Sequence, residues 1–143
     1  MGRVITIVMS NVFKRYHTPT GNEFYDKLVF ISTELTRLVM NEKIVPKKYH
    51  YVYSIPIINK LNQLRDDIKA EMTLYPTSEK LVECKKDIWQ RAIIHNEQII
   101  ELVQTMIIEL PSINIDKFEN VGNALVEESA ILRKCKSNTK LQK

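Results

Sequence analysis

The sequence predicts an all-α protein, an antiparallel up-down four-helix bundle, on three observations. Only 3 of the 143 residues are Gly and 5 are Pro, which is poor material for a turn-rich β-protein. Four stretches repeat apolar residues at steps of three and four, the period of a helix with one buried face. Short connectors join these stretches, and short connectors make successive helices antiparallel neighbours.

The first helix is expected over residues 22–42. Thr20 and Glu23 have the spacing of a capping box, and Asp26 adds negative charge to the first turn, where the helix dipole favours it. The predicted buried stripe of this helix consists of Phe24, Leu28, Ile31, Leu35 and Leu38.

The second helix follows a connector at residues 43–48 and is expected to reach Leu74. Pro56 leaves two beginnings open. Either the helix starts there, with Pro in its first turn after Ser54, or an earlier helix kinks at the proline. The predicted stripe consists of Ile57, Leu61, Leu64, Ile68 and Met72.

The third helix is expected to begin at Glu79, capped by Thr77 or Ser78, and to run to about Leu110. Its apolar residues cover an arc of roughly 140°, wider than the ~100° that a surface helix of one bundle needs. Two interpretations stay open: this helix is the most central one, or it also contacts another chain. We favour the second, because exposed apolar patches usually mark interfaces. The predicted oligomer interface consists of Trp89, Ile94, Ile100, Ile107 and Ile108.

Residues 111–114 end the third helix and cap the fourth, which has Asp116 in its first turn. The chain then divides into an N-terminal extension (residues 1–20), the four-helix bundle (21–136) and a basic C-terminal tail (137–143). The predicted stripe of the fourth helix consists of Ile115, Phe118, Val121, Leu125, Ser129 and Leu132.

Several classes of chemistry lack their motifs in this sequence. No run of 18 uncharged apolar residues could span a membrane, and the two cysteines, Cys84 and Cys135, are expected to be reduced thiols in a cytoplasmic protein. None of the three histidines belongs to a Glu-x-x-His or HxxxH pattern, and no CxxC, GxxxxGK or GxSxG occurs. We therefore expect no catalytic residue, no cofactor and no metal site.

One constellation supports a minor alternative. Arg91 and His95 resemble the Arg and His of helical-bundle ribonucleases of the HEPN class, although three residues separate them here instead of four to six. His95 falls on the apolar face of the third helix, so a structural histidine is the favoured interpretation.

Charge is segregated along the chain, whose net charge is +4. Residues 43–69 interleave three tyrosines with six bases and only two acids, whereas residues 97–132 hold seven acids against Lys117. Ammonium and guanidinium groups can neutralise phosphates, and tyrosine rings can stack on unpaired bases. A solvated face and a phosphate-binding face are both open at this point. The six bases are Lys43, Lys47, Lys48, Lys60, Arg65 and Lys69.

Four sequence patterns between Ile44 and Lys136 resemble a known family. They are Val-Pro-Lys-Lys-Tyr at 45–49, Trp-Gln-Arg at 89–91, Glu-Leu-Pro-Ser-Ile-Asn-Ile at 109–115, and Leu-Arg-Lys at 132–134. The arrangement is similar to the four-helix-bundle family that includes the accessory variability determinant (Avd) of diversity-generating retroelements. That family also contains bundle proteins encoded in intervening sequences of bacterial 23S rRNA genes.

The resemblance implies a non-catalytic protein that forms barrel-like homopentamers and binds an error-prone reverse transcriptase together with RNA or DNA. The polymerase makes cDNA mutated at adenines, and the accessory protein supplies the scaffold. The alternatives are a bundle of the intervening-sequence type, whose binding role is undefined, and the ribonuclease built on Arg91 and His95. By analogy with the family, the expected polymerase or nucleic-acid contacts are Lys47, Lys48, Lys60, Arg65, Lys85, Lys86 and Arg91.

Overall fold

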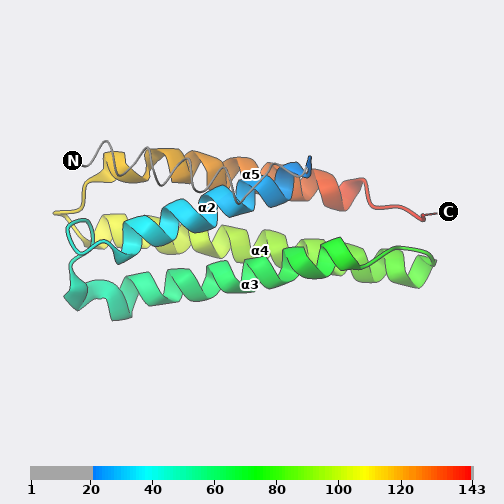
Figure 1. Cartoon of the computed structure of the whole chain (residues 1–143), viewed down its shortest axis with the longest axis horizontal. Helices are drawn as coiled ribbons and strands as arrows, with labels where there is room; N and C mark the ends of the chain where they lie inside the picture. The colour runs from blue at the N-terminus through cyan, green and yellow to red at the C-terminus, as the bar shows by residue number, and fades with distance from the viewer. Residues whose placement is uncertain (1–20, 143) are drawn as a thin grey trace.

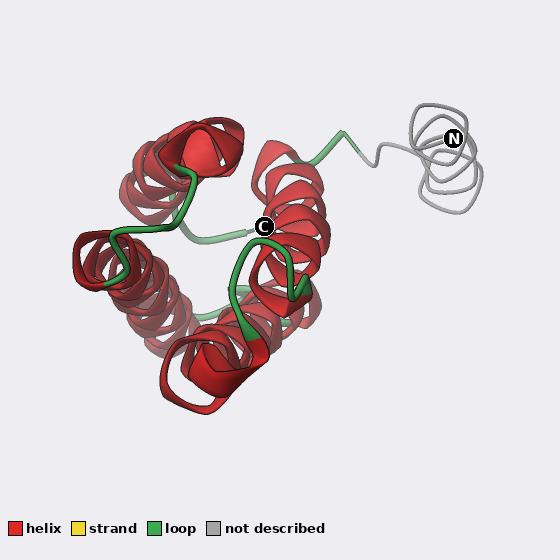
Figure 2. Cartoon of the chain, turned by 90° about the vertical axis from the view of Figure 1, so that its left-hand side faces the viewer, coloured by secondary structure: helices red, strands yellow, loops and turns green. Residues whose placement is uncertain are grey.

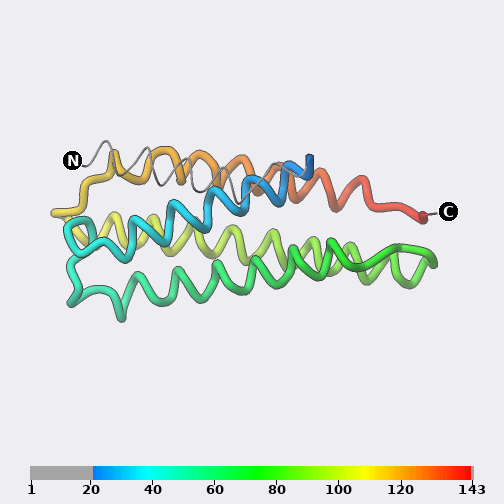
Figure 3. The backbone as a smooth tube through the Cα atoms, in the orientation of Figure 1, coloured from blue at the N-terminus to red at the C-terminus, as the bar shows by residue number. Residues whose placement is uncertain are grey.

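The computed structural model of the chain describes residues 21–142, and these form an antiparallel up-down four-helix bundle, as predicted (Figures 1 and 3). Each helix packs on the one before and the one after it, and the first helix also packs on the last, which closes the ring (Figure 2). The four helices are α2 (Glu23–Met40), α3 (Ile55–Thr73), α4 (Glu79–Glu109) and α5 (Glu119–Ser137). None of them is long and apolar enough to cross a membrane.

Most residues of the predicted stripes form the core, Phe24 and Ser129 are half-buried, and two residues are exposed. At the end of α3 the side chain of Glu71 is buried and that of Met72 is exposed, because Glu71 is the residue that meets a lysine of α4. Before α5, Ile115 is exposed and Ile113 is buried. Residues Ile115–Phe118 form a separate 3₁₀ turn, η3, so the 100° spacing of the α-helix does not extend back to Ile115.

Two of the helix beginnings follow the predicted capping chemistry. The hydroxyl of Ser78 accepts a hydrogen bond from the backbone N–H of Leu81 at 3.2 Å, which makes Ser78 the N-cap of α4. The side-chain oxygen of Asn114 accepts from the N–H of Asp116 at 3.1 Å, but the turn it begins is η3 and not α5. Thr20 of the predicted capping box lies outside the described residues.

Pro56 lies in the first turn of α3, which confirms the first of its two predicted roles. The chain reaches it through a 3₁₀ turn, η1 (Lys47–Tyr49), and a π-helical turn, η2 (His50–Ser54). The π-turn is anchored to the preceding segment, since the Ser54 hydroxyl donates to the carbonyl of Val39 at 2.5 Å. These turns fix the basic connector against the end of the bundle.

Candidate nucleic-acid interface

The six bases of residues 43–69, together called the basic face below, lie on η1, the loop before it and both flanks of α3, where Lys60 stands about 180° around the helix from Lys69. All are exposed except Lys60, which is half-buried. The segment contains two acids, but Asp67 is only 4% exposed, so Asp66 is the one acid of this segment that reaches the surface. Six bases against one exposed acid make the basic face more positive than its sequence alone indicated.

The interleaved tyrosines divide into packed and exposed rings. The rings of Tyr49 and Tyr53 lie 6.3 Å apart, and the ammonium of Lys48 sits 5.0 Å above the Tyr49 ring. The Tyr53 hydroxyl donates to the carboxylate of Glu109, and this hydrogen bond raises the pKa of Tyr53. Tyr51 is 83% exposed, which leaves its ring free to stack on a base.

Two of the predicted contact residues on α3, Lys60 and Arg65, each donate to one neutral side chain. The Arg65 guanidinium donates to the hydroxyl of Ser32 on α2 at 2.5 Å. The Lys60 ammonium donates to the side-chain oxygen of Gln63, one turn away, at 3.0 Å. Both partners are neutral, so each base keeps its full charge toward solvent.

Lys85 is a correction to the predicted contacts. Its ammonium donates to the backbone carbonyls of Glu71 at 2.8 Å and Leu74 at 2.9 Å, and lies 3.2 Å from the Glu71 carboxylate. The last carbonyls of a helix lack partners within the helix and attract a cation, and Lys85 fills this role for α3. Its donors are therefore used within the chain, whereas Lys86 is half-buried.

Arg91 and His95 of α4 converge on the buried Asp67 of α3. The Nδ1 atom of His95 lies 2.6 Å from one carboxylate oxygen of Asp67, and the Nε atom of Arg91 lies 3.4 Å from the other. The sequence indicated both of these residues but not Asp67. The available signal was its spacing of three residues from Leu64 of the predicted stripe, which puts it on the buried side of α3.

Trp89 is the second correction. Its side chain is buried within the chain and packs edge-to-face on Phe24 with the ring centroids 5.0 Å apart, so it cannot form part of an exposed interface. Ile100 and Ile107 are half-buried against the core, while Ile94 and Ile108 are exposed, the latter by 78%. Much of the wide apolar arc arises because α4 packs on both α3 and α5.

Comparison with protein-family models, with curated proteins and with solved structures finds no match to this chain. Within residues 21–142, no three His, Cys, Asp or Glu side chains gather as a group that could hold a metal ion. Two features therefore bear on function: the basic face, and the cluster of Asp67 with Arg91 and His95.

Proposed function

We propose that this chain is a non-catalytic accessory protein of a diversity-generating retroelement, binding the reverse transcriptase and nucleic acid as a cytoplasmic homo-oligomer, a pentamer by family resemblance. The proposal rests mainly on the basic face. Its six bases lie on η1, the loop before it and α3, and one of the two acids of the same segment, Asp67, is buried against Arg91 and His95.

The charge distribution also favours one part of the surface. The acids of residues 97–132 are exposed except Glu128, and they lie on α4, η3 and the first half of α5. A phosphate backbone is attracted to the exposed bases and disfavoured near these acids, one of which, Glu109, accepts from Tyr53 beside the connector. Tyr51, exposed on η2 between the bases of η1 and those of α3, adds a ring on which an unpaired base can stack.

Nucleic-acid binding is tested by fluorescence anisotropy with a labelled single-stranded RNA over a series of salt concentrations. Affinity should fall with salt, and the double variant Lys60→Gln/Arg65→Gln should reduce the slope of log K against log salt by roughly 1.4, about 0.7 for each lost phosphate contact. The matched control is Lys117→Gln, an exposed lysine of η3 next to Asp116, which should bind as the wild type does. Equal losses in the double variant and the control would overturn the basic face as the binding surface.

The retroelement assignment has its own test. An adjacent reverse-transcriptase gene and a repeat that diverges at adenines should accompany the gene, and the two proteins should co-purify when expressed together. Their absence would favour the intervening-sequence type of bundle, which shares the fold.

Assembly is tested by light scattering, where wild-type protein at micromolar concentration should exceed the mass of one chain. The variant Ile94→Asp/Ile108→Asp changes two exposed isoleucines of α4 and should give a folded monomer. A monomeric wild type would contradict the proposed homo-oligomer.

The contact between His95 and Asp67 favours one second candidate, the ribonuclease. A carboxylate 2.6 Å from one imidazole nitrogen fixes the orientation of the ring, as general acid–base catalysis requires. Arg91, 62% exposed beside it, is placed to meet a phosphate. RNA cleavage that is lost in a folded His95→Gln variant would establish this candidate, and intact RNA with wild-type protein would exclude it.

A further inference from the structure

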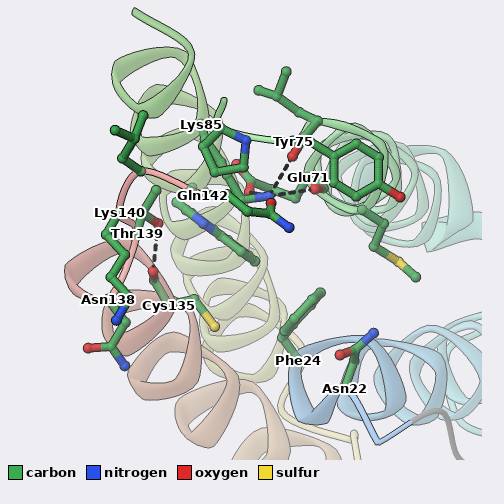
Figure 4. A pocket seen from close by; sticks show the side chains of 15 residues that line it. Asn22, Phe24, Glu71, Tyr75, Lys85, Cys135, Asn138, Thr139, Lys140 and Gln142 are labelled. Atoms are coloured by element: carbon green, nitrogen blue, oxygen red, sulfur yellow. Dashed lines mark hydrogen bonds and ion pairs between the residues drawn. The ribbon is translucent and has the colours of Figure 1, made fainter. Parts of the chain in front are cut away.

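A cavity of about 580 Å³ lies at the end of the bundle where α3 leads into α4, beside the beginning of α2 and the end of α5 (Figure 4). Its volume is within the range of small-molecule sites. Three of its walls are aromatic: Phe24 from α2, Trp89 from α4, and Tyr75 from the connector after α3. Aromatic walls of this kind can stack on a flat ring of a ligand.

One buried polar group in this cavity has no partner among residues 21–142, the indole N–H of Trp89. The Glu71 carboxyl beside it is fully buried and has the Lys85 ammonium 3.2 Å from its Oε2 atom. An unsatisfied buried group costs roughly 1–3 kcal/mol. A ligand that presents an acceptor to the Trp89 N–H would recover that cost.

The charges around these groups favour a neutral ligand. The Lys85 ammonium lies 3.2 Å from Glu71 Oε2 and is bonded to two carbonyls at the end of α3, so its charge is already opposed. Burial raises the pKa of Glu71 to about 7 even with Lys85 beside it. Neither a bare cation nor a bare anion meets an uncompensated charge here.

We propose that this cavity binds one unpaired nucleobase of the nucleic acid, an inference that rests on the proposed function. A base is flat and neutral, and its edge carries ring or carbonyl acceptors beside amino or imino donors. The ring stacks on Tyr75, the exposed aromatic wall, and the edge meets the Trp89 N–H and the Glu71 carboxyl. Lys140, exposed where it lines the cavity, neutralises the phosphate of the same nucleotide.

The end of the chain holds this cavity in shape. The backbone N–H of Gln142 donates to the carbonyl of Pro76 at 2.9 Å, which ties the tail after α5 to the connector after α3. The hydroxyl of Thr139 donates to the carbonyl of Cys135 at 2.8 Å and fixes the start of the tail. The wall is therefore built before a ligand arrives, which lowers the entropy lost on binding.

Trp89 is the only tryptophan of the chain, so its fluorescence reports on the cavity. Two single-stranded oligonucleotides of equal length and charge are compared, one with bases and one with abasic sites throughout. Both should bind through phosphate contacts, but only the base-bearing strand should change the Trp89 emission. Free nucleosides should produce the same change at higher concentration.

The matched variants are Tyr75→Ala, which removes an exposed wall of the cavity, and Phe30→Ala, which removes an exposed ring elsewhere on α2. Tyr75→Ala should weaken the base-bearing strand at least about fivefold and leave the abasic strand unchanged. Phe30→Ala should change neither.

The outcomes separate the two proposals. If both strands bind and neither alters Trp89, nucleic-acid binding stands and the base pocket is wrong. If neither strand binds, the proposed function fails, and the response of Trp89 to free nucleosides then decides on the pocket alone.

Discussion

The seam between α3 and α4 and the seam between α2 and α5 each bury a carboxylate, and the two are treated in opposite ways. Asp67, on α3, meets His95 at 2.6 Å and Arg91 at 3.4 Å from α4. Glu128, on α5, is completely buried, and neither of its oxygens has a hydrogen-bond partner among residues 21–142. One seam supplies partners for its acid and the other does not.

The difference shows two ways to bury an acid. Burial raises the pKa of Glu128 to about 9; Lys27 of α2 opposes the shift and Glu23 adds to it. Glu128 therefore keeps its proton at neutral pH and enters the core as a neutral group, which costs far less than a buried charge. Asp67 instead gains hydrogen-bonding and charged partners that compensate its burial.

The largest expected effect comes from breaking the partnered seam. His95→Ala should lower the free energy of unfolding by about 3 kcal/mol, because it leaves a buried carboxylate with only the more distant Arg91. Urea denaturation followed by circular dichroism measures the loss. In an Asp67→Asn background the same substitution should cost less than about 1 kcal/mol, and an equal cost in both backgrounds would show that His95 acts by packing alone.

At the seam between α2 and α5, replacing the buried acid should stabilise the fold instead of destabilising it. Glu128→Met replaces a buried polar group by an apolar one of similar volume and should raise the free energy of unfolding at pH 7 by about 2 kcal/mol. The control is Glu127→Met, an exposed neighbour, which should stay within about 0.5 kcal/mol of the wild type. A destabilised Glu128→Met would mean that its carboxyl has a partner in solution.

The same seam predicts how stability depends on pH. The pKa of Glu128 rises from 4.5 to about 9 on folding, and that of Glu71 from 4.5 to about 7, so the folded chain holds more protons than the unfolded one between these values. The free energy of unfolding should fall as pH rises above 4.5, by roughly 2–3 kcal/mol between pH 7 and pH 9, most of it from Glu128. Glu128→Met should flatten the curve between pH 7 and 9 and keep the decline below pH 7 that belongs to Glu71.

The sequence predicted the four helices, the Ser78 cap and most of the core, because helical periodicity reports directly on which face is buried. It did not predict that the side chains of Glu71, Asp67 and Glu128 are buried. Each of these acids falls within the buried stripe of its own helix, and only the facing helix decides whether a polar side chain there finds a partner.

For the candidate site, too, the sequence indicated which residue types are present but not which neighbours they contact. Periodicity shows how wide an apolar arc is but not which neighbour covers it, so Trp89 was assigned to an interface when Phe24 covers it within the chain. Lys85 was expected, by family analogy, to contact the polymerase or nucleic acid, and its bonds to the end of α3 could not be foreseen because the sequence does not fix where α3 ends. The exposed bases of η1 and α3, by contrast, followed from composition alone.

The smallest expected effect on stability is that of Arg91→Ala, on the partnered seam. Its guanidinium is 62% exposed and lies 3.4 Å from Asp67, so solvent screens the pair and its removal should cost less than about 1 kcal/mol. Binding should respond differently, because Arg91 is also a predicted nucleic-acid contact, and each lost phosphate contact lowers the salt slope by roughly 0.7. Urea denaturation and anisotropy on one preparation separate the two roles. A loss of stability as large as that of His95→Ala would show that Arg91, and not His95, is what compensates the buried charge of Asp67.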